Sequence, residues 1–282
     1  MTTTTPPIPP TETVSEAAVR SALSTRARPP RPGPMSTSFT FWWRAMLKIK
    51  HVPEQLFDVT MFPVMFLLMF TYLFGGALAG SPGEYLQGVL PGILAMTVLM
   101  ITMYTGLTLN RDIEKGVFDR FRAIPMWRPS TLVGPLLADG VRYSLASTVI
   151  IGLGLVLGFR PQAGAAGVLA AVGLLLIFSF SLSWLWTILG IVMRSENALM
   201  GMSMMILFPL TFISNVFVDP DTLPTWLEAF VDVNPVTHLV TAMRGLMHGG
   251  ATGGEIGVVL IMCAVLVAVF GPITMLVYRN KQ

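Results

Sequence analysis

The sequence predicts an all-α integral membrane protein with six transmembrane helices. Hydrophobic residues make up 53% of the 282 positions and charged residues only 12%, whereas soluble domains carry roughly 25% charged residues. Several long apolar stretches follow one another, each with enough residues to cross a hydrocarbon core of about 30 Å. Lys and Arg also gather in particular connections between these stretches, as is typical of proteins with a fixed orientation in the membrane.

The predicted spans cover residues 55–78, 86–109, 132–157, 164–193, 199–217 and 256–278. The fourth is the longest, so it must tilt or extend beyond the hydrocarbon. An even number of spans places both termini on the same side of the membrane. Most Lys and Arg residues lie in segments 1–52 and 110–130 or next to the C-terminus, which predicts that both termini are cytoplasmic.

Two segments precede the first span. Residues 1–38 are rich in Thr, Pro, Ser and Arg without sustained apolar periodicity, which predicts a disordered basic cytoplasmic tail. Residues 39–52, FTFWWRAMLKIKHV, combine the aromatic anchors Trp42 and Trp43 with the basic residues Arg44 and Lys48. This pattern predicts a short amphipathic helix on the cytoplasmic membrane surface.

The sizeable cytoplasmic loop is predicted at residues 110–130, NRDIEKGVFDRFRAIPMWRPS. Ile113, Val117, Phe118 and Phe121 recur at helical spacing, with charged residues between them, and Pro125 closes the pattern. These features predict a short amphipathic helix. On composition alone, a solvated charged loop that only fixes the topology is the alternative interpretation.

Residues 218–246 follow the fifth span and are predicted on the outer face. Pro220 and Pro224 interrupt any helix there. Apolar residues then recur at three- and four-residue steps from Leu223 to Val231, Trp226 among them, which predicts an amphipathic helix too short to cross the bilayer. Asn234-Pro235 breaks the chain again before a second short helix. Such a segment is expected to re-enter the membrane or lie at its face, packed on protein.

Two of these segments resemble the ABC-2 family, the membrane subunits of a class of ATP-driven exporters. In the loop, the pattern Glu-x-Gly-x-x-Asp-Arg-x-Arg-x-x-Pro matches Glu114, Gly116, Asp119, Arg120, Arg122 and Pro125. In the outer segment, the matching residues are Phe212, Phe217, Pro220, Pro224, Trp226, Asn234, Pro235 and Arg244. The resemblance covers about residues 39–280 and is nearest in look to the daunorubicin- and doxorubicin-resistance membrane subunits of actinomycetes.

The resemblance implies the type V exporter fold: an elbow helix at 39–52, a cytoplasmic coupling helix within 110–130 and an extracellular re-entrant helical hairpin at 218–246. It also implies a homodimer in the bacterial plasma membrane, joined by two copies of a separate ATP-binding subunit that holds ATP and Mg. No G-x-x-x-x-G-K-[ST] phosphate loop occurs in the sequence, so this chain is predicted to be a transport subunit without cofactors and not an enzyme. The implied substrate is an anthracycline-like compound. Lipid and polysaccharide exporters share the same motifs, so lipid and polysaccharide are the alternative substrates.

Methionine and aromatic residues in the spans are the candidates for a substrate cavity. Thioethers and flat rings suit large planar amphipathic molecules, although ordinary helix packing is the alternative for each residue. The candidates are Met96, Met100 and Met103 of the second span, Trp184 of the fourth, and Met204 and Phe208 of the fifth.

Other classes of function find less support in the sequence. Asp139 and Arg142 are three residues apart and are predicted to pair on one helical face. Mid-span positions are otherwise almost free of carboxylates, which argues against the proton-driven secondary transporter kept as a second class. No catalytic set points to a membrane enzyme. His238 and His248 lack zinc-type spacing, so no metal site is predicted, and neither is nucleic-acid binding.

Overall fold

The computed structural model describes residues 21, 33–51, 53–116, 130–217 and 224–280. Helices and their connections make up these residues, and no strand occurs among them. Much of the predicted tail, the loop residues from Val117 to Pro129, and the segment from Val218 to Leu223 lie outside them. The described part confirms the all-α fold class.

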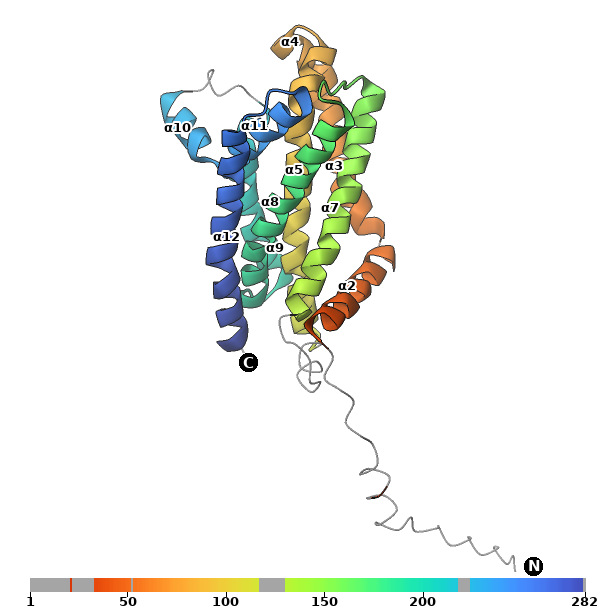
Figure 1. The fold of residues 1–282 in the computed structure, drawn as a ribbon, viewed down its shortest axis with the longest axis vertical. Coiled ribbons are helices and arrows are strands. Elements are labelled where there is room, and N and C mark those ends of the chain that lie inside the picture. Colours follow the sequence, from red (N-terminus) through yellow and green to blue (C-terminus); the bar gives the residue numbers. More distant parts are fainter. Residues whose placement is uncertain (1–20, 22–32, 52, 117–129, 218–223, 281–282) are drawn as a thin grey trace, which may run out of the picture.

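Helix α5, Pro82–Glu114, is the central column of the bundle (Figure 1). It begins with a proline at its first position, and the Ser81 side chain accepts a hydrogen bond from the Glu84 amide at 3.2 Å, a favoured helix start. Helices α7, Ser130–Leu157, and α8, Gly164–Val192, pack against it. These neighbours bury most α5 side chains, which explains why the sequence of α5 is apolar on all sides of the helix.

The first predicted span is helical throughout but not uniform. It consists of α3, Pro53–Met69, the π-helical turn η1, Phe70–Phe74, and α4, Gly75–Ala79. The span ends at Gly80, whose φ of 77° is in the left-handed region that favours glycine. A π-turn inserts one residue into the helical register, which a purely periodic analysis of the sequence does not detect.

Helix α2, Pro34–His51, precedes the first span and starts earlier than the predicted residue 39. Pro34 suits the first position of a helix, and the Thr37 hydroxyl donates to the Gly33 carbonyl at 2.7 Å. Figure 1 shows α2 lying obliquely beside the start of α7. The contact is close, because a Cβ added at Gly134 of α7 would come within 2.4 Å of the Phe41 Cβ.

The fifth predicted span differs most from the structure. Helix α9, Glu196–Phe212, has 17 residues and stops before the predicted end at residue 217. At 1.5 Å per residue it is about 25 Å long, less than a hydrocarbon core of about 30 Å. Five stretches of the described chain are long and apolar enough to cross: Met61–Ala79, Pro82–Glu114, Val133–Leu157, Gly164–Val192 and Gly253–Arg279. The count of six full-length spans is therefore not confirmed.

Two short helices follow α9, as the proline breaks predict. They are α10, Thr225–Val233, and α11, Pro235–His248, which Asn234 separates. Helix α12, Gly253–Asn280, then completes the described chain. Figure 1 places α4, α10 and α11 at one end of the bundle, and the start of α2 and the end of α12 at the other.

Candidate functional site

Two helices approach each other closely at the seam between α5 and α8. A Cβ added at Gly106 would lie 2.4 Å from the Trp186 carbonyl oxygen, and one added at Gly190 would lie 2.5 Å from the Gly106 carbonyl oxygen. One turn away, the Trp186 indole N–H donates to the Thr102 hydroxyl at 2.6 Å. Small residues that bring two backbones together are typical of membrane helix pairs. The seam therefore holds α5 and α8 in a fixed register.

The seam continues to the last turns of α5, where polar side chains contact the connection between α8 and α9. The Asn110 amide donates to the carbonyls of Gly190 and Met193 at 3.0 and 2.9 Å. These carbonyls belong to the end of α8, where intrahelical donors run out. Next to it, Arg111 forms an ion pair with Glu196 in the first turn of α9. The end of α5 thus binds both α8 and α9.

The electrostatics of this contact favour the charged pair. The hydrogen bond from Arg111 lowers the pKa of the Glu196 carboxyl below its ordinary value, and the nearby charge of Lys115 acts in the same direction. Glu196 also lies at a helix N-terminus, where the peptide dipoles favour a negative charge. Helix α2 also contacts this end of α5. Arg44 of α2 lies 3.8 Å from Asp112 of α5.

At the other end of the bundle, Asn234 and Arg244 bind the backbone that follows α9. The Asn234 amide donates to the carbonyls of Leu210 and Ile213 at 2.9 and 2.6 Å, while its oxygen accepts from the Val236 amide and caps α11. Asn234 therefore joins the last turn of α9 to the first turn of α11 with one side chain.

Arg244 of α11 reaches both α5 and the same exit from α9. Its Nε donates to the Gly88 carbonyl at 2.7 Å, and its Nη2 donates to the carbonyls of Asn215 and Val216 at 2.7 and 3.2 Å. The backbone of residues 213–217 is no longer helical, so its carbonyls need hydrogen-bond donors from elsewhere in the protein. The predicted positions Asn234 and Arg244 thus come together around one segment, and Pro235 follows Asn234 as the first residue of α11.

Phenylalanine side chains line up between the first span and the end of α9. Phe66 and Phe70 lie at centroid distances of 6.4 and 4.6 Å from Phe217, and Phe212 lies 5.4 Å from Phe217. Further stacked or tilted contacts extend the series in both directions. The phenylalanine series comprises Phe62, Phe66, Phe70, Phe74, Phe208, Phe212 and Phe217. Distances of this size are favourable for aromatic pairs, and both ends of the series are exposed.

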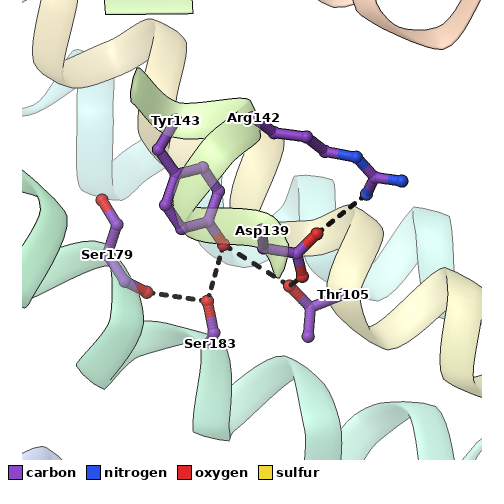
Figure 2. A network of polar contacts seen from close by, with 6 residues as sticks. All are labelled: Thr105, Asp139, Arg142, Tyr143, Ser179 and Ser183. Atoms are coloured by element: carbon purple, nitrogen blue, oxygen red, sulfur yellow. Dashed lines mark hydrogen bonds and ion pairs between the residues drawn. The ribbon is translucent and has the colours of Figure 1, made fainter. Parts of the chain in front are cut away.

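A buried polar network crosses the bundle between α5, α7 and α8 (Figure 2). Asp139 of α7 accepts hydrogen bonds from Thr105 of α5 at 2.6 Å and from Arg142 at 2.9 Å. The Tyr143 hydroxyl lies 2.9 Å from the Ser183 hydroxyl of α8. The predicted pairing of Asp139 with Arg142 is confirmed. A buried carboxylate with a cationic partner and a hydroxyl donor is a satisfied arrangement.

The predicted coupling and elbow residues divide between the described and undescribed parts of the chain. Phe118, Asp119, Arg120, Arg122, Pro125 and Pro220 lie outside the described residues. Glu114 is exposed in the last turn of α5, so the start of the predicted loop at residue 110 is in fact helical. Gly116 follows with a φ of 62° and ends the helix.

The elbow residues all lie in α2. Trp42 and Arg44 are partly buried and Trp43 is 56% exposed, while Lys48 belongs to the same helix. In the segment 218–246, which is predicted to lie on the outer face, Pro224 precedes α10 and Trp226 is 75% exposed on it. A bulky aromatic side chain this exposed near the end of the bundle is typical of the membrane interface.

The candidate cavity residues do not share one surface. Met96 and Met103 are buried and Met100 is partly buried on α5, whereas Met204 and Phe208 are exposed on α9. Trp184 is buried on α8. The positions in α5 follow the packing alternative, because α5 is enclosed by its neighbours. The two residues of α9 remain accessible.

Sequence reasoning missed the contacts of Asn110, Arg111 and Glu196 between α5, α8 and α9. Arg111 entered only as a positive charge that indicated the cytoplasmic side, and Glu196 was not singled out. Two signals were available: a polar Asn-Arg pair directly after an apolar stretch, and a Ser-Glu helix start in the short connection before α9. The sequence gives no indication that these two distant segments meet.

Five long apolar stretches in the described part of the chain, packed into one bundle, define a multi-pass membrane protein. Comparison with known proteins gives the family: a profile of the ABC-2 type transporter family matches residues 38–248. The chain belongs to the ABC-2 type transporter family of membrane proteins.

Curated relatives in this family are permease subunits. The chain is 50% identical over 280 residues, 99% of both chains, to the daunorubicin resistance ABC transporter permease protein DrrB1 of Streptomyces coeruleorubidus. It is 24% identical over 189 residues, 67% of this chain and 68% of the relative, to the probable doxorubicin resistance ABC transporter permease protein DrrC of Mycobacterium tuberculosis. It is 20% identical over 200 residues, 70% of this chain and 54% of the relative, to the probable multidrug ABC transporter permease YbhR of Escherichia coli.

Proposed function

We propose that this chain is the membrane subunit of an ATP-driven exporter that carries planar amphipathic compounds of the daunorubicin type out of the cell. The observation that carries the proposal is the 50% identity, over 99% of both chains, to a daunorubicin resistance permease. ATP and Mg are bound and used by a separate subunit. Two copies of this chain with two copies of that subunit form the exporter, with both termini in the cytoplasm.

The polarity of charge along the bundle supports this orientation. Arg111 and Lys115 lie at the C-terminal end of α5, and Arg44 of α2 lies 3.8 Å from Asp112 of the same turns, in agreement with an excess of Lys and Arg on the cytoplasmic side. Glu114 is the last residue of the buried column α5, and Gly116 follows two residues later. A segment attached to a rigid column is well suited to receive a push from an ATPase.

The phenylalanine series supports a planar amphipathic substrate. Its rings are stacked or tilted against one another, with Phe208 57% exposed and Phe62 and Phe74 also accessible. A flat polycyclic molecule gains the same offset stacking from such rings. Met204, exposed one helical turn before Phe208, adds an adaptable thioether surface.

The alternatives find no comparable support. Lipid or polysaccharide export by the same fold is distinguished by the substrate test below. A proton-driven secondary transporter needs a carboxylate that exchanges protons within the membrane. Asp139 is buried there but accepts hydrogen bonds from Thr105 and Arg142, which suits a fixed structural role.

The first experiment tests the ATPase partner. The tagged chain is purified in mild detergent from its native cell, in parallel with the variants Glu114→Ala and Gly116→Pro. We expect an ATPase of about equal copy number to accompany the wild type and to be lost from both variants. Glu84→Ala is the matched control, because Glu84 is exposed in the first turn of α5, at the opposite end of the helix.

The second experiment tests the substrate. Inverted membrane vesicles that contain the chain and its ATPase should accumulate daunorubicin only when ATP is present, and Phe208→Ala should reduce the accumulation. Persistent uptake without ATP, or the absence of any ATPase in several detergents, would overturn the proposed function. ATP-dependent transport of lipid or polysaccharide without daunorubicin uptake would replace the substrate and keep the exporter.

A further inference from the structure

Helix α9 is connected to α5 by an arginine at each of its ends. Arg111 of α5 pairs with Glu196 at the start of α9, and Arg244 of α11 bridges the Gly88 carbonyl of α5 to the backbone just after α9. At its start, therefore, α9 is joined to α5 by a charged side-chain contact as well as by packing.

The inner connection lies next to the predicted coupling residues. Arg111 is three residues before Glu114, so about 4.5 Å of helix axis separates them. Both residues belong to one unbroken helix, α5, which ends at Glu114. A displacement of the end of α5 therefore reaches Arg111 without passing through a flexible connection.

The seam between α5 and α8 prevents α5 from sliding along α8 when the end of α5 is displaced. Gly106 and Gly190 approach so closely that added Cβ atoms would overlap the opposite backbone, and close-packed interfaces change between discrete arrangements instead of deforming continuously. The Asn110 amide fixes the last turn of α8 through the carbonyls of Gly190 and Met193. Consequently α8 follows α5, and the connection to α9 follows both.

We propose that Asn110, Arg111 and Glu196 form a joint that transmits displacement of the cytoplasmic end of α5 to the start of α9. The inference rests on the proposed function, because that function supplies the displacement. Arg111 and Glu196 are positioning residues in this scheme, and neither contacts the substrate. Helix α9 then tilts about its outer end, where Asn234 and Arg244 bind it.

This tilt has a direct consequence for the phenylalanine series. Phe208 and Phe212 belong to α9, whereas Phe66 and Phe70 belong to the first span. Tilting α9 changes the separation between the two halves of the series. The joint would thus convert a movement at the ATPase side into a rearrangement of the proposed substrate surface.

The test compares transport with ATP hydrolysis in proteoliposomes that contain this chain and its ATPase subunit. The variants are Glu196→Gln, Arg111→Gln and the double substitution, with Glu84→Gln as the matched control on α5. We expect daunorubicin transported per ATP hydrolysed to fall about two- to thirtyfold, a range typical of residues that couple two sites. Binding of the ATPase should be unchanged, since Glu114 and Gly116 are intact.

The double variant provides an internal check. If the two residues act through one contact, losing both should cost no more than losing either, because the effects of contacting residues are not additive. Suppose that the wild type shows ATP-dependent uptake and that Glu196→Gln transports as much daunorubicin per ATP hydrolysed as the wild type does. This result would overturn the inference and leave the proposed function intact. A wild type without ATP-dependent uptake overturns the proposed function, and the inference with it.

A crosslink separates transmission from mere stability. In a Cys263→Ser background, which removes the single cysteine of the chain, the pair Arg111→Cys and Glu196→Cys is joined by a short bifunctional thiol reagent that can be cleaved. We expect the crosslinked protein to transport as much daunorubicin per ATP hydrolysed as the Cys263→Ser protein does. After cleavage of the reagent, this amount should fall to that of the double glutamine variant. Equal ratios before and after cleavage would contradict the joint, even if the glutamine variants fold poorly.

Discussion

Replacing Gly190 by alanine should break the closest contact between α5 and α8. The added Cβ would lie 2.5 Å from the Gly106 carbonyl oxygen and 3.0 Å from the Gly106 Cα. Both atoms are backbone in the middle of a long helix, so no side chain can rotate away to make room. One of the two helices has to move, and the Asn110 hydrogen bonds at the same turn would be stretched.

The magnitude follows from two opposing effects. Alanine favours a helix interior over glycine by roughly 0.5–1 kcal/mol, while overpacking a filled interior costs about 1–3 kcal/mol. Because the clash here is with backbone, we expect the upper part of that range and a net loss of about 2 kcal/mol. For a chain of this size, such a loss lowers the Tm by roughly 4–8 °C.

The matched control is Gly173→Ala in the same helix. A Cβ added at Gly173 meets nothing within 4 Å, so this substitution should leave the Tm unchanged or raise it slightly. Both variants are measured by thermal unfolding in the same detergent. Equal Tm values for Gly190→Ala and Gly173→Ala would refute the close seam, and the rigid movement of α5 with α8 would lose its basis.

Three further predictions concern charged side chains. Asp139→Asn removes the negative charge that faces Arg142 and should cost about 3 kcal/mol, the lower end for breaking a buried pair, measured as a lower Tm; an unchanged Tm would contradict the buried pair. Arg244→Ala removes the donor to three backbone carbonyls and should lower stability by about 3 kcal/mol, whereas an effect below about 1 kcal/mol would show that water replaces it. Because Arg111 lowers the pKa of Glu196 from its ordinary 4.5, the stability of that pair is fully present above that pH and is lost as the pH falls through the lowered value. The Tm difference between wild type and Glu196→Gln should therefore be equal at pH 6 and pH 8, and a difference that changes between them would contradict the assignment.

Local patterns in the sequence were sufficient for most of the helices. The predicted span 164–193 agrees with α8, Gly164–Val192, and the Asn234-Pro235 break separates α10 from α11 as expected. Apolar length and proline position are properties of neighbouring residues, so they are readable without tertiary information. The same holds for the pairing of Asp139 with Arg142, which lie on one face of one helix.

Contacts between distant segments were not readable in the same way. Asn110 and Met193 are far apart in sequence, and nothing in either segment specifies the other. Some helix ends also differ from the prediction: the predicted loop starts at residue 110, whereas residues 110–114 continue α5. A helix can extend beyond its apolar part when the polar residues find partners, and here Arg111 and Asp112 find Glu196 and Arg44. Their partners, not their own polarity, decide the structure.

The short length of α9 explains why the motif residues Asn234 and Arg244 stand where they do. A helix of 17 residues is shorter than a hydrocarbon core of about 30 Å, so within the membrane the carbonyls of residues 210–216 would face an apolar environment without helical donors. Each such group would cost several kcal/mol. Asn234 and Arg244 together donate to four of these carbonyls. The same bonds that satisfy this backbone also attach it to α11 and, through Gly88, to α5. The carbonyls after α9 therefore keep their hydrogen-bond donors on α11 in the proposed tilt of α9, because the tilt displaces the opposite end of the helix, at Glu196.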